Sequence, residues 1–96
     1  MRIEVRTEGG FAGSISRPPL VVETDELEPG PAKELERLAK ALPAGTDPPA
    51  RGADLMRYDV QVDDAGERRT ATYFEPGVPE PVRALLHLAR EAGRGP

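Results

Sequence analysis

Alternation of apolar and polar residues predicts a first pair of strands near the start of the chain. Residues 2–7 place Ile3 and Val5 on one face and charged side chains on the other, which is the period-two pattern of a half-buried strand. A second strand is predicted from Ser14 to Thr24, with an interruption at Pro18-Pro19. Because two prolines remove two main-chain donors, we place this interruption at a sheet edge or a bulge. The two strands are expected to form an antiparallel hairpin.

A second hairpin is predicted in the other half of the chain. Apolar and polar residues alternate from Met56 to Val62, the clearest strand pattern in the sequence, and Glu67 to Phe74 is expected to return beside it. Between them, Asp63-Asp64-Ala65-Gly66 predicts the turn, with Gly66 at a position that needs a left-handed backbone.

Apolar residues that recur with a period of 3.6 predict two helices. The first uses Pro29 or Pro31 in its opening turn and ends at Pro43. The second opens at Val78-Pro79-Glu80-Pro81 and has Gly93 as its C-cap. The apolar stripes of the two helices consist of Leu35, Leu38, Ala39 and Leu42, and of Val82, Leu85, Leu86 and Ala89.

The predicted order of elements is therefore ββαββα, and the predicted fold class is α+β. Two such hairpins pair into one four-stranded antiparallel sheet with both helices packed on one face. This arrangement buries the helix stripes and leaves the other face to water or to a partner. A chain of 96 residues is long enough for one domain. We expect a single α+β domain over residues 1–93 and a frayed C-terminal tail over residues 94–96.

Composition narrows the classes of function. The net charge is −4 and no predicted element carries a basic stripe, which disfavours nucleic acid as a partner because phosphate binding depends on Lys and Arg. The absence of cysteine excludes disulfides, thiolate catalysis and zinc sites built on sulfur. No apolar run is long enough to cross a membrane, and the alternating start from Met1 to Arg6 lacks the apolar core of a signal peptide. We therefore expect a cytoplasmic protein without a membrane partner.

Candidate catalytic groups are few. His87 is the only histidine, and its helical neighbours include two arginines and one acid, so we interpret it as a surface residue. Asp63 and Asp64 are interpreted as turn residues, because acid catalysis needs a desolvated carboxyl group. Gly9-Gly10-x-x-Gly13 precedes a strand rather than a helix, and it lacks the Lys-Ser/Thr of a phosphate loop. We predict a protein that is not an enzyme and has no cofactor, no metal and no small-molecule substrate.

Two unusual features of the first hairpin suggest a surface for a protein partner. Phe11 lies between glycines, where it either folds back as a lid on the core or stays exposed as an apolar anchor for a partner's pocket. Arg17-Pro18-Pro19 is either an ordinary sheet edge or a stiff recognition segment. The acidic loop from Asp25 to Pro31 is a third candidate surface, and the alternative is a solvated face that binds nothing.

The order of several short segments resembles the emfourin family. The similarity runs from residue 1 to about residue 92, and the segments that carry it are Met1-Arg2-Ile3-Glu4-Val5, Gly9-Gly10-Phe11-Ala12-Gly13, Thr24-Asp25-Glu26-Leu27, Leu35 and Leu38, Tyr58-Asp59-Val60 and Val78-Pro79. Emfourin-like proteins are small bacterial inhibitors of protealysin and related thermolysin-like zinc metallopeptidases. The resemblance implies a cytoplasmic inhibitor of such a peptidase that needs no cofactor of its own.

The binding element that we predict is the first hairpin. Its candidate contact residues are Gly9, Gly10, Phe11, Ala12, Gly13, Arg17, Pro18 and Pro19. Thermolysin-like enzymes favour large apolar side chains next to the cleaved bond, so the hypothesis places Phe11 at or beside the peptidase cleft. We also expect the chain to act as a monomer. The alternative is a non-inhibitory adaptor or an antitoxin-like module that binds protein but has no peptidase target.

Overall fold

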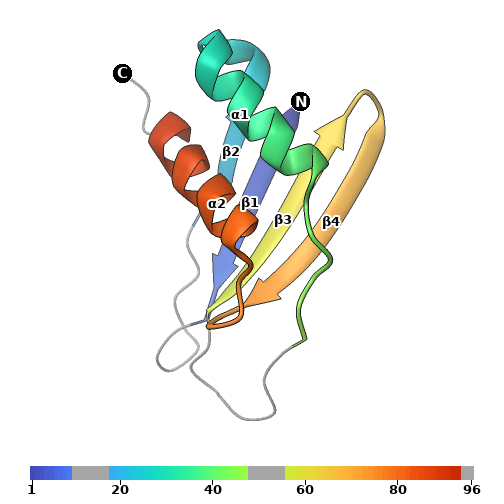
Figure 1. The fold of residues 1–96 in the computed structure, drawn as a ribbon, viewed down its shortest axis with the longest axis vertical. Helices are drawn as coiled ribbons and strands as arrows, with labels where there is room; N and C mark the ends of the chain where they lie inside the picture. The colour runs from blue at the N-terminus through green and yellow to red at the C-terminus, as the bar shows by residue number, and fades with distance from the viewer. Residues whose placement is uncertain (10–17, 48–55, 94–96) are drawn as a thin grey trace.

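Four strands and two helices make up the part of the chain that the computed structural model describes, which is residues 1–9, 18–47 and 56–93. They follow one another in the order ββαββα (Figure 1). Their bounds, with those of one short 3-10 turn, are β1 Arg2–Glu8, β2 Leu20–Glu23, η2 Thr24–Glu26, α1 Pro29–Lys40, β3 Arg57–Asp64, β4 Glu67–Phe74 and α2 Glu80–Gly93.

The strands form one antiparallel sheet with the order β2-β1-β3-β4. Both predicted hairpins are present, and they are joined through β1 and β3, whose register places Ile3 opposite Val62 and Val5 opposite Val60. Both helices lie on the same face of the sheet (Figure 1). The α+β class and the ββαββα order predicted from the sequence are therefore confirmed.

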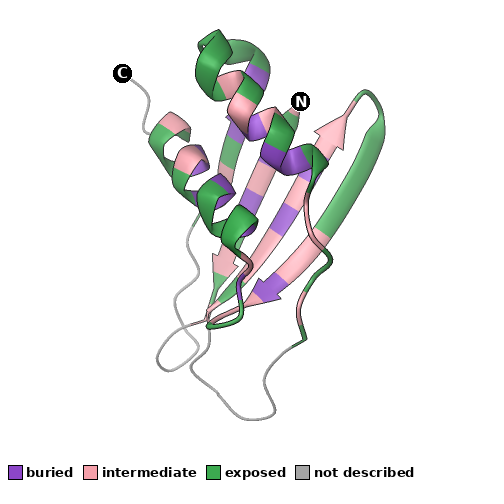
Figure 2. Cartoon of the chain, viewed as in Figure 1, coloured by how far each residue is buried: buried purple, intermediate pink, exposed green. Residues whose placement is uncertain are grey.

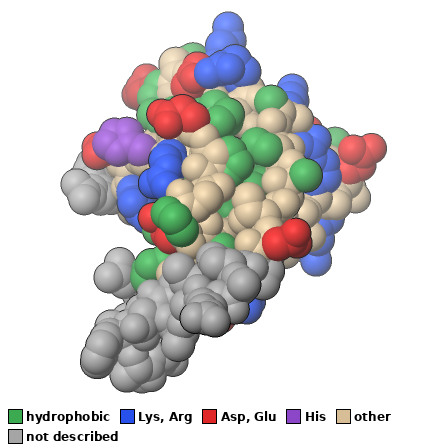
Figure 3. Space-filling view, turned by 60° about the horizontal axis from the view of Figure 1, so that its bottom comes forward, with side chains coloured by type: hydrophobic (Ala, Val, Ile, Leu, Met, Phe, Trp, Pro, Cys, Tyr) green, Lys and Arg blue, Asp and Glu red, His purple; other side chains and the backbone are tan. Residues whose placement is uncertain are grey.

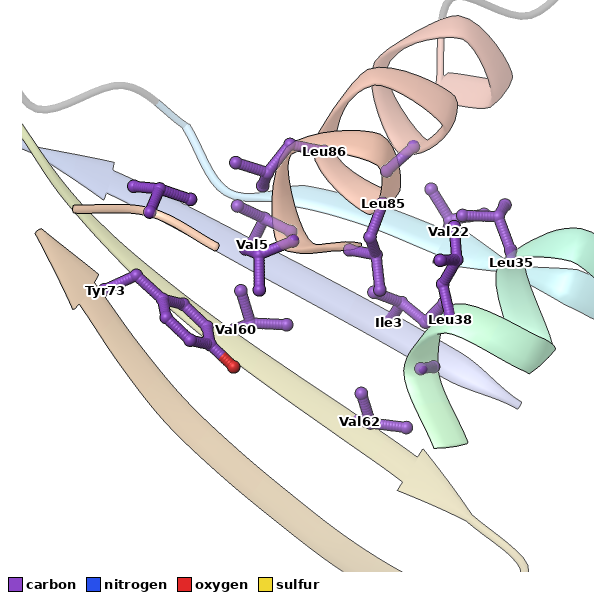
Figure 4. Close-up of a cluster of buried hydrophobic side chains, with 14 residues drawn as sticks. Ile3, Val5, Val22, Leu35, Leu38, Val60, Val62, Tyr73, Leu85 and Leu86 are labelled. Atoms are coloured by element: carbon purple, nitrogen blue, oxygen red, sulfur yellow. The ribbon is translucent and has the colours of Figure 1, made fainter. Parts of the chain in front are cut away.

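The hydrophobic core lies between this face and the helices (Figures 2 and 4). Alternation along the strands turns Ile3, Val5 and Val22 toward the helices, and each of these residues is at most 4% exposed. The buried residues of the core are Ile3, Val5, Val22, Leu35, Leu38, Ala39, Val60, Val62, Tyr73, Val78, Val82, Leu85, Leu86 and Ala89. The predicted helix stripes are thus confirmed, except that Leu42 is only partly buried.

The described part of the second strand starts after the predicted interruption and ends one residue earlier than predicted. In the described chain, β2 spans only Leu20–Glu23, so Pro18-Pro19 precede the strand and Thr24 belongs to η2. Residues 14–17 lie outside the described residues. β2 is an edge strand, as expected for a strand next to two prolines. Because proline cannot donate to the ladder, the described pairing with β1 starts only after the prolines.

The turn of the second hairpin is also shorter than predicted. Asp63 and Asp64 are the last residues of β3, and the turn itself is Ala65-Gly66, with φ angles of 51° and 89°. Positive φ at both positions is what a two-residue hairpin turn with the right twist requires. The Asp63 carboxylate accepts a hydrogen bond of 2.8 Å from Arg68 Nε on β4. It therefore stabilises the strand pair across the hairpin rather than the turn backbone.

The two predicted features at the end of the chain differ in their outcome. Gly93, predicted as a C-cap, is the last residue of α2 in the described structure. The predicted tail, residues 94–96, lies outside the described residues.

The segment after α1 covers part of the outer edge of β4. The fully buried Tyr73 donates its hydroxyl to the Pro43 carbonyl at 2.5 Å. Thr46 N donates to the Thr72 carbonyl, and Phe74 N donates to Thr46 Oγ1, both at 2.9 Å. The two bonds of Thr46 satisfy backbone groups of β4 that an open edge strand leaves unpaired.

Arg69 on β4 ties the sheet to the C-terminus of α1. Its guanidinium donates to the main-chain carbonyls of Ala39 and Lys40 at 3.0–3.1 Å. The last carbonyls of a helix lack partners within the helix and carry partial negative charge. A cation that donates to them therefore supplies the missing hydrogen bonds and balances the charge. This contact helps to fix α1 over the centre of the sheet.

The two central residues of β2 provide a test of which face is buried. Val22 is 4% exposed, whereas its neighbour Val21 is 41% exposed on the opposite face. Val22→Ala should lower the free energy of unfolding by about 2 kcal/mol, because it removes buried methyl groups and leaves a cavity. Val21→Ala is the matched control and should change stability by less than about 0.5 kcal/mol. Urea denaturation measures both, and equal effects would contradict the assigned orientation of β2.

Candidate functional site

The described residues of the predicted binding element lie at one end of the first hairpin. Gly9 directly follows β1, and Pro18-Pro19 directly precede β2 (Figure 1). Gly9 has a φ of 108°, a backbone conformation that residues other than glycine rarely adopt. Both prolines are exposed. The other predicted contact residues, Gly10, Phe11, Ala12, Gly13 and Arg17, lie outside the described residues.

Strand register brings further segments to the same end of the sheet. Glu8, Arg57 and Phe74 stand side by side as terminal residues of β1, β3 and β4. One step beyond them, Glu75 N donates to the Met56 carbonyl at 3.0 Å. Because neighbouring strands are about 5 Å apart, the chain segments that follow β1 and β4 lie on the order of 10 Å from each other.

Arg57 links these strand ends by charge. Its Nη2 lies 2.8 Å from Asp59 Oδ2 and 3.6 Å from Glu8 Oε2. The second contact joins β3 to the last residue of β1, next to the start of the predicted binding element. Exposed pairs of this kind contribute only about 0–1 kcal/mol to stability, so the importance of Arg57 here is to orient the strand end.

Asp59 is the most protected carboxylate of this group. Burial alone raises the pKa of its carboxyl group, but hydrogen bonds from Arg57 and from Thr72 Oγ1, the latter 2.7 Å long, outweigh burial and hold the pKa below its ordinary value. Asp59 therefore remains ionised at neutral pH and acts as the anion that Arg57 and Thr72 bind. It is not poised to exchange a proton near neutral pH, as a general acid or base is.

The open face of the sheet carries a shallow polar hollow of about 210 Å³. Its polar lining consists of Glu4, Arg6, Arg57, Asp59, Gln61, Thr70 and Thr72. Charges of opposite sign are paired along it: Arg6 Nε, for example, donates to Glu4 Oε2 at 3.0 Å. Within the described residues, every buried side-chain nitrogen or oxygen has a hydrogen-bond partner. A face of paired charges suits solvent or a protein contact better than catalysis, which uses perturbed groups.

The acidic stretch from Asp25 to Pro31 lies at the opposite end of the sheet. It forms η2 and the start of α1, directly after the end of β2, where Glu23 is paired with Arg2. Its three carboxylate residues are exposed. Next to this stretch, the buried Thr24 donates a hydrogen bond from its hydroxyl to the Glu36 carboxylate at 2.7 Å. The acidic stretch is therefore separate from the surface around Gly9.

His87 is exposed on α2, in agreement with its interpretation as a surface residue. Across residues 1–9, 18–47 and 56–93, no group of three or more His, Cys, Asp or Glu residues is arranged to hold a metal ion. In the same part of the chain, no helix is both long and apolar enough to cross a membrane.

Sequence reasoning does not single out the turn between β4 and α2, although it lies at the same end as Gly9. Arg83 holds this turn: its Nε donates to the Val78 carbonyl and its Nη2 to the Pro76 carbonyl, both at 3.2 Å. The same Nη2 lies 3.3 Å from Glu75 Oε1. No sequence pattern marks Arg83 for this role, because two of its acceptors are main-chain carbonyls whose positions depend on the fold.

Figure 3 brings this end of the molecule forward. On the face that Figure 3 shows, side chains of Lys and Arg and side chains of Asp and Glu are interspersed among the described residues. Hydrophobic side chains lie between them. A surface of mixed charge is unlike the basic footprint of a nucleic-acid-binding protein.

Comparison with known proteins identifies one family. A family model described as Emfourin matches residues 5–90, which include α1, all strands apart from the first residues of β1, and α2 apart from its last three residues. A search of the curated proteins and a search of the solved structures each return no match.

The low pKa of Asp59 predicts a pH dependence of stability. Its pKa in the folded chain lies below the unfolded value of about 3.9, so its contribution is fully present above that value and is lost as the pH falls through the folded-state pKa. Asp59→Asn should lower the free energy of unfolding by about 1–2 kcal/mol at pH 7, because it weakens charged hydrogen bonds. Urea denaturation between pH 7 and pH 2 should show this difference shrinking below about pH 4.

Two threonines on β4 supply the control for this experiment. Thr72→Val removes the hydroxyl that donates to Asp59 and should raise the pKa of that carboxyl group, as measured by NMR titration. Thr70→Val alters an exposed threonine on the same face of the same strand and should leave the pKa of Asp59 unchanged. If Asp59→Asn destabilises equally at both ends of the pH range, ionisation of Asp59 does not stabilise the fold.

Proposed function

Because the chain belongs to the emfourin family of protease-inhibitor domains, we propose that it inhibits a zinc metallopeptidase of the protealysin and thermolysin type. The observation that carries the proposal is the family match over residues 5–90, which spans the whole sheet apart from the first few residues of β1. The paired charges of the described surface support a role in binding rather than in catalysis. In this proposal the protein is a bacterial, cytoplasmic monomer with a peptidase as its protein partner.

The first hairpin is the proposed binding element. Gly9 follows the end of β1, and Pro18-Pro19 precede the start of β2. They therefore connect the residues between them to two paired strands of the sheet. Loops held by a rigid scaffold are the usual carriers of binding residues, because the scaffold fixes their ends before the partner arrives. In the proposal, Phe11 enters an apolar pocket beside the peptidase's catalytic centre, and Arg17 contributes a polar contact.

The stiffness of the attachment points favours tight binding. Proline has a fixed φ angle, and therefore Pro18-Pro19 lose little conformational freedom when a partner binds. Arg57 holds the neighbouring strand end through Glu8, next to Gly9. A segment whose ends are already ordered retains more of its contact energy as affinity.

An inhibition assay tests the function directly. The purified chain, titrated into a thermolysin-like peptidase with a chromogenic peptide substrate, should abolish hydrolysis in proportion to its concentration. Phe11→Ala should raise the inhibition constant at least about tenfold, because buried aromatic anchors dominate interface energies. Arg17→Ala should raise it by a smaller factor.

Lys33→Ala is the control for these variants. Lys33 is exposed on α1, and its removal should leave the inhibition constant unchanged. If Phe11→Ala and Arg17→Ala both inhibit like the parent chain, the first hairpin is not the binding element. If the parent chain leaves every thermolysin-like peptidase tested fully active, the proposed function is wrong, and a non-inhibitory adaptor or antitoxin-like module takes its place.

A further inference from the structure

The turn between β4 and α2 occupies the same end of the sheet as the proposed binding element. Phe74, the last residue of β4, is paired with Arg57, which is in turn paired with Glu8 at the end of β1. The turn therefore starts two strands away from the residue that precedes Gly9, which is a distance of about 10 Å. This distance is short compared with the width of a protein interface, so one partner can reach both Gly9 and this turn.

This turn is held more firmly than a simple connection requires. Gly77 N donates to the Phe74 carbonyl at 3.0 Å, which closes the turn. Val78, only 6% exposed, is anchored in the core. Arg83 donates to the carbonyls of Pro76 and Val78 at 3.2 Å and thereby fixes the backbone on both sides of Gly77.

The exposed part of the turn is suited to contact with another protein. Pro76 and Gly77 are exposed, and Pro79 is half-buried beside them. Glu75 is the charged residue within Glu75–Pro79, and it forms an ion pair 3.3 Å long with Arg83, so its carboxylate is not stripped of water without a partner. A pre-ordered tip without an unpaired charge loses little free energy when it is covered.

We propose that the Glu75–Pro79 turn is a second contact element, which docks on the uncharged rim of the peptidase cleft beside the site taken by the first hairpin. The inference rests on the proposed function. Two contact elements on separate strands resist tilting of the bound inhibitor, whereas a single hairpin leaves rotation about its own axis free. In this arrangement Arg83 is a positioning residue, because it acts through the backbone of the turn.

A steric block at Gly77 tests the proposal. Among the described residues, a Cβ atom at Gly77 meets only the Phe74 carbonyl oxygen, at the ordinary contact distance of 3.7 Å, so this part of the fold has room for a Cβ atom there. A Cβ atom at Gly30 on α1 meets nothing within 4 Å, which makes Gly30 the matched control. Gly77→Trp should raise the inhibition constant at least tenfold, and Gly30→Trp should leave it within twofold of the parent.

A second measurement does not depend on a bulky side chain. The chain has no cysteine, so Gly77→Cys introduces a single thiol. Its reaction with a maleimide should slow at least tenfold in the presence of an excess of the catalytically inactivated peptidase. The thiol of Gly30→Cys should react at the same rate with and without the peptidase. This comparison tests whether the peptidase covers the turn, and it remains valid even where Gly77→Trp destabilises the fold and lowers its melting temperature.

The outcomes separate the two proposals. If the parent chain inhibits while the Gly77 variants inhibit equally well and their thiol stays reactive in the complex, the second contact element is refuted and the proposed function stands. If the parent chain does not inhibit, both proposals fall together. A slowed thiol at Gly77 with an unchanged thiol at Gly30 supports the second contact element.

Discussion

The antiparallel pairing of β1 with β3 is the contact on which the rest of the structure depends. A two-stranded hairpin is at best marginally stable on its own, and this pairing merges the two hairpins into one sheet. It places Ile3 beside Val62 and Val5 beside Val60, so the four side chains form one apolar strip under the helices. A slip of one residue in either strand turns its apolar side chains to the polar face. The alternating pattern in both strands therefore specifies the register.

The same register assembles the candidate binding surface. Gly9 and Glu75 are far apart in the sequence, and they come to one end of the sheet because Glu8, Arg57 and Phe74 are aligned across three strands. The surface thus consists of short segments, and each is attached to the end of a strand that has one face buried in the core. The relative position of Gly9 and Glu75 depends on the core, because the strand ends next to them can separate only when strand pairing breaks.

The accuracy of the sequence predictions follows the range of the interactions involved. Strands and helices were predictable because burial of one face leaves a periodic pattern within a few residues, as in the Leu85 and Leu86 stripe of α2. At the end of the second strand the pattern extended one residue too far, because alternation does not show that Thr24 begins the 3-10 turn η2. Arg69 and Arg83 escaped notice because both donate to main-chain carbonyls, which no side-chain pattern records. The proposed anchor Phe11 and the second proposed contact residue, Arg17, lie outside the described residues.

In the proposed function, the protein occupies the peptidase cleft without behaving as a substrate. Substrates bind as flexible, extended segments, and the entropy lost on binding reduces their affinity. An inhibitor avoids this loss when its contact segments are ordered in advance, and ordering requires bonds that do not involve the partner. In this chain, Arg57 and Arg83 make such bonds beside Gly9 and around Gly77, at the end of the sheet where the proposed contacts lie. The charges of Arg57 and Arg83 thus act within the molecule, where they hold the backbone, whereas the proposal gives Arg17 a polar contact with the partner.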